Sequence, residues 1–409
     1  MEGKILAVSK EAKTLIAVVA IICLLAGFGI AWVFKPAPPV KPRLTVIGPW
    51  GGAERELFVP VLDAFAVETG IEVDYRMYRA EDLATILPAQ FEAKKTPGDV
   101  IFMWAWWIRN NTDHILDVSD VITSADFMPG TVDQVTVDDK IYGAPYTGKV
   151  KPGFWYRISF FKEHNLEVPT TWEEFETLLD TINDTLGIVP IASGDGVGWP
   201  LSDVTEHFLL TFGGVDLFKG LINGSVSWTS DEVKAIFRDN LVPLLEAGYF
   251  SEPKDWTLIL EDWWEGKHAL YFMGSWITGM VANASDLGLF SLPGAEAFVF
   301  APDFMFIPKY TEYSYEAKEL VKFLSGVKGQ TVQVKQGGHI GTNLEVKLDD
   351  YPAVDKRVAE ILEGATAVTD LDDTVGGDFQ TTFWGQLKYL WVHPEEWEGV
   401  LANIEAKAP

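Results

Sequence analysis

The sequence predicts an α/β fold that begins as a doubly wound parallel sheet, and two observations lead to this prediction. Three short apolar runs alternate with two longer segments in which apolar residues recur at helical spacing, all within about sixty residues. Hydrophobic residues make up 48% of the 409 residues, which is enough to fill the cores of two domains of ordinary size. The segments are strand 44–48, helix 54–69, strand 71–75, helix 81–95 and strand 99–103.

Further strands and helices are expected through the rest of the chain. A hairpin is predicted around Asp138 and Asp139, and Thr170 or Thr171 is expected to cap a helix whose first turn is acidic. Extended segments are expected over 154–156, 188–192, 269–272 and 298–307. Helices are expected from 159, over 172–182, 201–212, 230–247, 315–324 and 354–362, and from 378.

Tryptophans follow several of the expected strands. The segment 97–109, PGDVIFMWAWWIR, is typical of a buried strand that leads into an exposed aromatic loop with Trp104, Trp106 and Trp107. Ligands of open α/β sheets bind outside the carboxyl ends of the strands, so these rings predict a shared aromatic cleft. Aromatic faces suit sugars, whose C–H faces are apolar. The rings expected in this cleft are Trp50, Trp104, Trp107, Trp199, Trp276 and Trp384.

The alternative is that each of these rings is simply part of a core. Trp155, Trp172, Trp263 and Trp264 are better interpreted as core or rim residues.

Polar residues near the expected cleft are few. Lys149 and Asp195 are candidates to hydrogen-bond sugar hydroxyls, although either could be a solvated loop charge. The adjacent acidic pairs are expected to be solvated at helix starts and turns rather than to hydrolyse a glycosidic bond. These pairs are Glu173–Glu174, Asp349–Asp350 and Asp372–Asp373.

No catalytic, cofactor or metal site is expected from motifs. The six histidines lack a His-x-x-x-His spacing, and neither a Gly-x-Ser-x-Gly elbow nor a phosphate loop occurs. The single cysteine, Cys23, permits neither an internal disulfide nor a cysteine metal site. The formal net charge of -27 argues against nucleic acid as a partner.

The N-terminal segment has the pattern of a membrane anchor. Lys4, Lys10 and Lys13 precede the uncharged stretch 14–34, which is long enough to cross a bilayer as a helix. Residues 1–35 are therefore expected to be an uncleaved single-pass anchor, with a proline-rich spacer at 36–43 and the binding domain outside the cell. A cleaved signal peptide is the alternative. Sequons at Asn110, Asn183, Asn223 and Asn283 agree weakly with an extracellular chain.

Several motifs, in their order, resemble those of the family 1 extracellular solute-binding proteins of ABC transporters, the group that includes maltose-binding protein. They are LTVIGPWGG, ETGIEV, PGDVIFMWA, DDKIYGAPY, FWYR, VPTTWEEF, EGKHALYFMGSW, YEAKELVKFL and TTFWGQL. The resemblance implies a two-lobed periplasmic-binding-protein-like fold of type II with hinge strands between the lobes. On this pattern the N-terminal lobe comprises 44–148 and 304–330, and the C-terminal lobe comprises 149–303 and 331–409.

The resemblance also implies a function. The expected protein captures a carbohydrate and delivers it unchanged to the subunits of an ABC permease. The tryptophan-rich cleft favours an oligosaccharide over a monosaccharide, and the protein is expected to be a monomer. Trp276 and Trp384 would stack on sugar rings, and the loops at Trp50, Trp104, Lys149 and Trp199 would line the cleft. The chain departs from the pattern at Trp106, Trp107 and Lys149, so the hydrogen bonds to the sugar cannot be transferred.

Two other functions stay open at this point. One is an anchored enzyme that acts on polysaccharides, and the other is a binding protein or sensor for a solute that is not a sugar. Other members of the resembled family bind glycerol phosphates, metal ions or polyamines.

Overall fold

The computed structural model describes residues 42–196 and 198–409, together with 10–11, 14–15, 17–19 and 21. Most of the expected anchor at 1–35 and of the expected spacer at 36–43 lies outside the described residues. Arg43, expected in the spacer, is the first residue of a strand. Within the described part, no helix combines the length and apolar character that crossing a bilayer requires. Residues 43–409 form one compact unit, and the fold below is that of this unit.

The first sheet begins as the sequence predicts. Strand β1 (Arg43–Gly48) pairs in parallel with β2 (Glu72–Met77) and with β3 (Val100–Phe102). Helices α2 (Gly52–Thr69) and α3 (Ala80–Glu92) connect these strands, as expected for a doubly wound sheet. The parallel alternation inferred from apolar periodicity is therefore confirmed.

Four further strands complete this sheet. They are β6 (Ala144–Lys151), β13 (Ala297–Phe306), β14 (Ile340–Gly341) and β15 (Thr366–Val368). The order across the sheet is β14-β6-β13-β3-β1-β2, with β15 pairing β13. β13 runs antiparallel to both β3 and β6, so the sheet is mixed.

A second sheet forms the core of the other lobe. Its order is β12-β7-β11-β8, from β7 (Phe154–Arg157), β8 (Ile191–Ala192), β11 (Leu270–Phe272) and β12 (Leu287–Phe290). β7 is antiparallel to both neighbours, and β8 is parallel to β11. Short ladders pair β4 (Thr136–Val137) with β5 (Lys140–Ile141), and β9 (Gly194–Asp195) with β10 (Lys254–Asp255).

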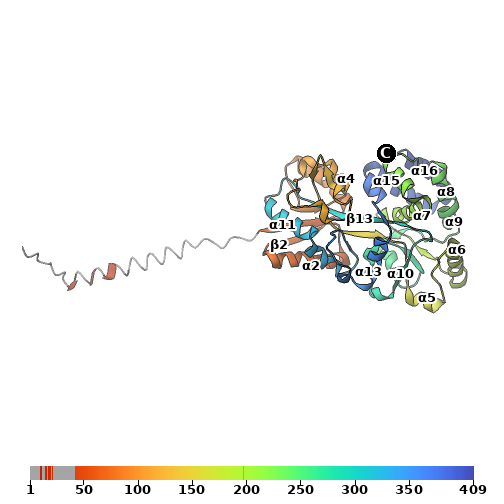
Figure 1. Ribbon diagram of the computed structural model, residues 1–409, viewed down its shortest axis with the longest axis horizontal. Coiled ribbons are helices and arrows are strands. Elements are labelled where there is room, and N and C mark those ends of the chain that lie inside the picture. Colours follow the sequence, from red (N-terminus) through yellow and green to blue (C-terminus); the bar gives the residue numbers. More distant parts are fainter. Residues whose placement is uncertain (1–9, 12–13, 16, 20, 22–41, 197) are drawn as a thin grey trace, which may run out of the picture. The chain divides into compact units, whose positions relative to one another are not determined.

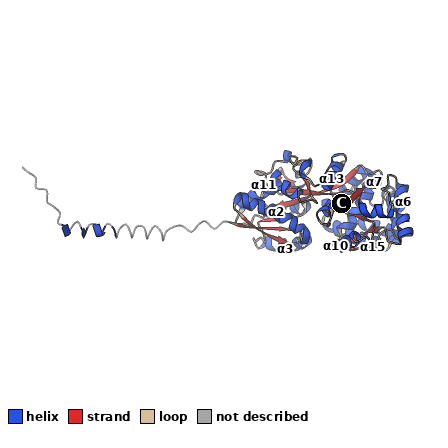
Figure 2. Ribbon diagram, turned by 90° about the horizontal axis from the view of Figure 1, so that it is seen from below, coloured by secondary structure: helices blue, strands red, loops and turns tan. Residues whose placement is uncertain are grey.

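Helices surround the strands in both lobes (Figure 2). The helices between α3 and β11 are α4 (Ala105–Asn110), α5 (Ile158–His164), α6 (Trp172–Thr181), α7 (Trp199–Asn223), α8 (Asp231–Ile236), α9 (Val242–Glu246) and α10 (Trp256–Trp264). The later helices are α11 (Ser314–Ser325), α12 (Val327–Val334), α13 (Ala353–Glu363), α14 (Leu371–Val375), α15 (Gly377–Val392) and α16 (Trp397–Glu405).

Strands β6 and β13 pass from one lobe to the other (Figure 1). In β13, Phe298 packs in a core of the second lobe, whereas Met305 packs in a core of the first. In β6, Tyr146 belongs to the core of the first lobe and Val150 to a core of the second. Lys149, between Tyr146 and Val150 in β6, therefore lies at the boundary, and Lys151 follows Val150 on the second-lobe side.

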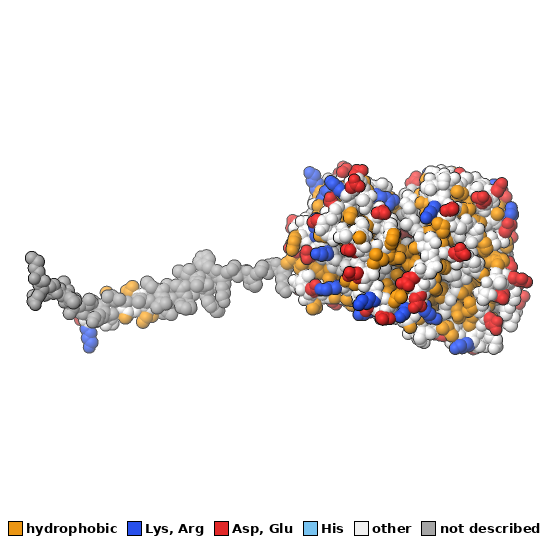
Figure 3. Space-filling model, viewed as in Figure 1, with side chains coloured by type: hydrophobic (Ala, Val, Ile, Leu, Met, Phe, Trp, Pro, Cys, Tyr) orange, Lys and Arg blue, Asp and Glu red, His pale blue; other side chains and the backbone are white. Residues whose placement is uncertain are grey.

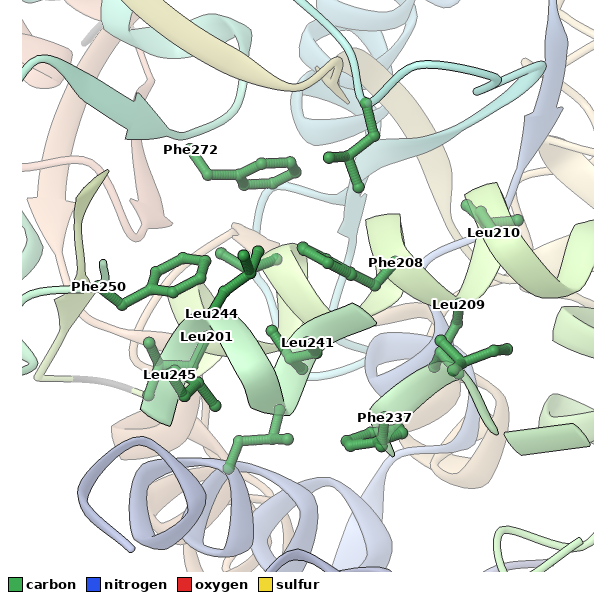
Figure 4. Packing of buried hydrophobic residues seen from close by; sticks show 14 of the residues in the cluster. Leu201, Phe208, Leu209, Leu210, Phe237, Leu241, Leu244, Leu245, Phe250 and Phe272 are labelled. Carbon is green, nitrogen blue, oxygen red and sulfur yellow. The ribbon is translucent and has the colours of Figure 1, made fainter. Parts of the chain in front are cut away.

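Helix α7 forms much of the hydrophobic core of the second lobe. Leu201 and Phe208 of α7 pack with Leu241, Phe250 and Phe272 (Figure 4). The helix is interrupted at Gly214, whose φ of 74° and ψ of 176° are not helical. Asp203 and Glu206 are buried in the same apolar helix. Their burial requires compensating partners, which lie at the boundary between the lobes.

The aromatic segment after β3 differs from its prediction. It was expected to be an exposed loop, but Ala105–Asn110 forms the short helix α4. Ala105 and Ile108 are buried, as is Trp107, so one side of α4 packs inward. Trp104 and Trp106 are only partly buried, and their rings stack at 5.8 Å with an interplanar angle of 17°.

Candidate functional site

A cavity of about 580 Å³ lies between the two lobes. Residues of the loop after β1, the start of α3 and the end of β3 line one side, while the start of α7, α10 and the segment after β11 line the other. Residues of β6 and β13 lie between the two sides. Figure 3 shows an indentation between the lobes on one face of the molecule.

Six tryptophans from both lobes line this cavity. They are Trp50, Trp104, Trp199, Trp256, Trp276 and Trp384. Five of them were predicted from their positions after strands or near a helix start. Trp256 was missed, because it starts α10 after the two-residue strand β10, which the sequence pattern did not reveal. The structure therefore brings together rings that are far apart in the chain.

The ring of Trp50 is held largely by the first lobe. It is 2% exposed and packs against Phe58 and Phe102, with ring centroids 4.6 and 4.7 Å away. Its backbone N–H donates to the Tyr75 hydroxyl at 2.9 Å. Trp50 thus contributes an edge of the cavity rather than a fully open face. Trp104 offers more of its ring, since it is only partly buried.

In the second lobe, Trp199, Trp256 and Trp276 form a cluster. Trp199 lies 5.5 Å from Trp256 and 5.3 Å from Trp276 between ring centroids, in tilted and edge-on arrangements. Residue 274 must be a glycine here, because a Cβ on it would overlap the Trp276 ring. Trp199 and Trp256 are partly buried, whereas Trp276 is 5% exposed. The cluster is a preformed aromatic wall.

Trp384 lies on α15 and is 8% exposed. Its indole Nε1 donates a hydrogen bond to Asp372. Gly198, at φ 103°, lies under this ring, and a Cβ there would stand 2.7 Å from ring atoms of Trp384. The Gly-rich end of the strand before α7 thus allows Trp384 to reach the cavity.

Lys149 of β6 lies between the lobes, where its ammonium faces two cavity rings. Its Nζ is 5.6 Å from the ring centroid of Trp50 and 5.7 Å from that of Trp276, within the range of a cation–π contact. It also lies 3.5 Å from the Asp303 carboxylate of β13. Burial raises the pKa of Asp303, an effect that nearby Lys149 opposes. Burial likewise raises the pKa of Glu54 across the cavity.

Two predicted site residues lie elsewhere. Trp107 is 4% exposed and packs against Phe91 and Phe306, so it belongs to a core of the first lobe. Asp195 is 2% exposed, pairs with Lys388 at 2.8 Å and accepts the backbone N–H of Gly198 at 3.2 Å. Neither lines the cavity. Asp195 holds the turn before α7, and its placement does not support a hydrogen bond to ligand.

A buried charged cluster at the second-lobe side was missed by the sequence analysis. Lys151 of β6 pairs with Asp203 of α7 and with Asp370, the N-cap of α14. Burial would lower the pKa of Lys151, but the carboxylates of Asp203 and Asp370 outweigh burial and raise it. For Asp203 burial outweighs Lys151 and raises the pKa to about 7.

The position of Asp372 differs from its prediction. The pair Asp372–Asp373 was expected to be solvated, but Asp372 is 1% exposed and lines the cavity beside Trp384. Its burial, reinforced by the Asp370 charge, raises its pKa well above the usual range. The pattern that could have revealed the cluster is the pair Asp203 and Glu206, polar residues three positions apart in an apolar helix.

Comparison with known proteins identifies the family of this chain. The family profile described as bacterial extracellular solute-binding protein matches residues 51–331. The chain belongs to this family. An uncharacterised ABC transporter extracellular-binding protein of Pyrococcus horikoshii is 52% identical over 371 residues, which are 90% of this chain and 88% of that protein. The family resemblance inferred from the motifs is thereby confirmed.

Solved structures of sugar receptors share the two-lobed α/β fold of this solute-binding protein. A bacterial solute receptor, described as preferring β-D-galactopyranose exclusively, superposes with a TM-score of 0.80 at 18% identity, covering 90% of this chain and 98% of that one. A chitin oligosaccharide binding protein gives a TM-score of 0.76 at 20% identity, with coverage of 90% and 98%. At these identities the likeness establishes the fold.

Proposed function

We propose that this solute-binding protein captures a carbohydrate, an oligosaccharide rather than a single sugar, in the cavity between its lobes. The observation that carries the proposal is the set of six tryptophans from both lobes around one cavity. Flat apolar rings stack on the C–H faces of sugars, and several rings spread along a cavity offer room for more than one sugar unit. The solved relatives that bind galactopyranose and chitin oligosaccharides support the same class of ligand.

The charges around the cavity favour a neutral ligand. Acidic residues outnumber basic ones in the cavity wall, which disfavours phosphorylated or other anionic solutes. Carboxylates can instead accept hydrogen bonds from hydroxyl groups. The acidic residues are Glu54, Glu81, Asp255, Asp303, Asp370, Asp372 and Asp373, and the basic ones are Arg79, Lys149 and Lys151.

Capture would proceed by closure of the lobes around the ligand. A ligand in this cavity contacts both sides at once only when the lobes are closed, so binding stabilises the closed arrangement. β6 and β13 would act as the hinge, with lobe boundaries near 148 and 304. The closed, loaded protein then delivers the carbohydrate to an ABC permease without changing it. The segment 1–35 would tether the protein, as a monomer, outside the membrane.

The test uses two tryptophans that are only partly buried. Trp104→Ala and Trp199→Ala each remove a stacking face, one from each lobe, and each is expected to weaken sugar binding roughly tenfold or more, about 1.4 kcal/mol. Trp172→Ala is the matched control, because Trp172 is a partly buried tryptophan of the second lobe that does not line the cavity. Calorimetric titration with an oligosaccharide that the wild-type protein binds measures the affinity of all three variants. Wild-type affinity in both cavity variants would rule out stacking.

A further inference from the structure

The buried charged cluster beside the cavity contains more carboxylates than ammonium groups. Lys151 is 6% exposed, and the four carboxylates of Asp203, Glu206, Asp370 and Asp372 are at most 4% exposed. One positive charge against four negative charges leaves three formal negative charges in a nearly dry environment. Unpaired charges of this kind are costly to bury, so either bound protons or a further cation must compensate them.

Lys151 does not compensate all four acids. Its ammonium pairs with Asp203 and Asp370. Within residues 42–196 and 198–409, no lysine, arginine or histidine lies within ion-pair distance of Glu206 or Asp372. Among the described residues, the donors to Asp372 are the neutral Ser202 hydroxyl at 2.8 Å and the indole of Trp384, and its carboxyl group also contacts that of Asp370.

Glu206 provides the second observation. The residue is 0% exposed, and its Oε2 accepts one hydrogen bond, from the backbone N–H of Leu371 at 3.3 Å. Its Oε1 has no hydrogen-bond partner in the described part of the chain. A buried carboxylate oxygen that lacks a donor and lies beside two other acids is suited to a cation.

The spacing fits one ion. Glu206, Asp370 and Asp372 each offer a carboxylate oxygen, and the three oxygens lie within 4.8 Å of one another. Oxygen ligands lie about 2.4 Å from Ca²⁺, so two of them on opposite sides of the ion would be about 4.8 Å apart. Asp370 and Asp372 also line the cavity, which gives an ion a path from solvent.

We propose that Glu206, Asp370 and Asp372 bind a hard divalent cation, Ca²⁺ foremost, at the wall of the cavity. Ca²⁺ is favoured over softer metals because all three protein ligands are carboxylates, and over Mg²⁺ because Ca²⁺ accepts irregular oxygen coordination. Oxygen atoms of water would complete its coordination from the cavity side. The ion would tie α7 of the second lobe to the segment that begins α14.

The experiment exploits Trp384, whose indole contacts one of the proposed ligands. Residues 42–409, without sugar, are first freed of metal with EDTA, and the EDTA is then removed. The protein is titrated with Tb³⁺, a substitute for Ca²⁺ whose luminescence is sensitised by a nearby tryptophan. We expect saturable Tb³⁺ luminescence that Ca²⁺ displaces, and a saturable rise in melting temperature with Ca²⁺ alone. Absence of both responses in the wild-type protein would overturn the proposal and indicate that protons neutralise the cluster.

Variants locate the ion. Glu206→Gln is expected to weaken Ca²⁺ binding at least tenfold while melting no lower than the metal-free wild type, since it removes an unpaired buried charge. Asp372→Asn is expected to weaken Ca²⁺ binding to a similar extent, and it provides the test if Glu206→Gln does not fold. Glu54→Gln is the matched control, because it makes the same change at a partly buried glutamate that lines the cavity outside the cluster, and it should keep the full Ca²⁺ response. An unchanged response in both cluster variants would contradict the site. Because no sugar is present, this outcome is independent of carbohydrate binding.

Discussion

At the residue scale, His207 shows how burial changes chemistry in the second lobe. The side chain is 2% exposed on α7, and its ring lies 5.1 Å from that of Phe272. Its Nε2 accepts the backbone N–H of Leu292 at 3.1 Å, which requires the neutral imidazole with the proton on Nδ1. Burial lowers the pKa of His207 from 6.5 to about 3.

This depressed pKa has a definite sign for stability. Below pH 6.5 the unfolded chain binds a proton at this histidine, whereas the folded chain does not until pH about 3. Its contribution to stability is therefore complete above pH 6.5 and is lost as the pH falls, by up to about 1.4 kcal/mol per pH unit.

Replacement of His207 tests this linkage. In His207→Gln the side-chain amide oxygen can accept the same backbone N–H, so acid should destabilise the variant less steeply than the wild type between pH 6.5 and about 3. Urea denaturation at several pH values gives the two slopes. His393→Gln changes a partly exposed histidine outside this core and serves as the control, with a slope expected to match that of the wild type. Identical slopes for His207→Gln and the wild type would show that this residue does not titrate on unfolding.

Single residues also show what a sequence can reveal about the site. Trp50, Trp104, Trp199 and Trp276 were found because they follow strands or start helices, positions that the chain itself displays. Trp384 was found because it was expected near a helix start, although it lies in the middle of α15. Asp372 was misjudged, since its burial depends on Ser202 and Trp384, which only the folded chain brings to it. Long-range contacts of this kind leave no local pattern.

At the element scale, helix α6 illustrates a start that the sequence specifies. The Thr171 hydroxyl accepts the backbone N–H of Glu174 at 3.2 Å, and the Glu174 carboxylate accepts the backbone N–H of Thr171 at 3.2 Å. This capping box satisfies backbone donors that an uncapped helix leaves free. Prediction succeeded here because all partners lie within four residues.

Removal of this cap should affect stability alone. Thr171→Ala is expected to lower the free energy of unfolding by about 1 kcal/mol, a typical value for loss of an N-cap. Thr177→Ala makes the same substitution at an exposed position inside α6 and should be neutral or slightly stabilising, because alanine favours helix. Chemical denaturation measures both. Sugar affinity should not change in either variant, since α6 does not line the cavity. If the two variants unfold with equal free energies, the cap does not contribute to stability.

The segment after β3 marks where prediction of elements failed. The apolar run before Trp104 correctly predicted the strand β3, but the tryptophans that follow were interpreted as an exposed loop rather than as the helix α4. Once the segment is helical, Ala105 and Ile108 face the core with Trp107, and Trp106 stacks on Trp104 instead. A helix of six residues is too short for its periodicity to be read, so the direction of Trp107 could not be predicted.

At the scale of the whole molecule, the two lobes and the two strands between them define the site. Four of the six tryptophans come together because β1, β3, β11 and the strand before α7 all end at the boundary, while β6 and β13 cross it. The other two come from the start of α10 and from α15. Family membership agrees with this architecture. The class of ligand is then set by the surface of the cavity, which is aromatic and acidic.

The most direct measurement is a calorimetric titration of residues 42–409 with neutral mono-, di- and oligosaccharides, and with a phosphorylated sugar for comparison. We predict saturable, one-to-one binding of at least one neutral oligosaccharide, recovered unchanged afterwards, and much weaker binding of the phosphorylated sugar. Preference for an anionic solute, or no heat with any carbohydrate, would contradict the proposed function. Recovery of a shortened sugar would point to an enzyme instead.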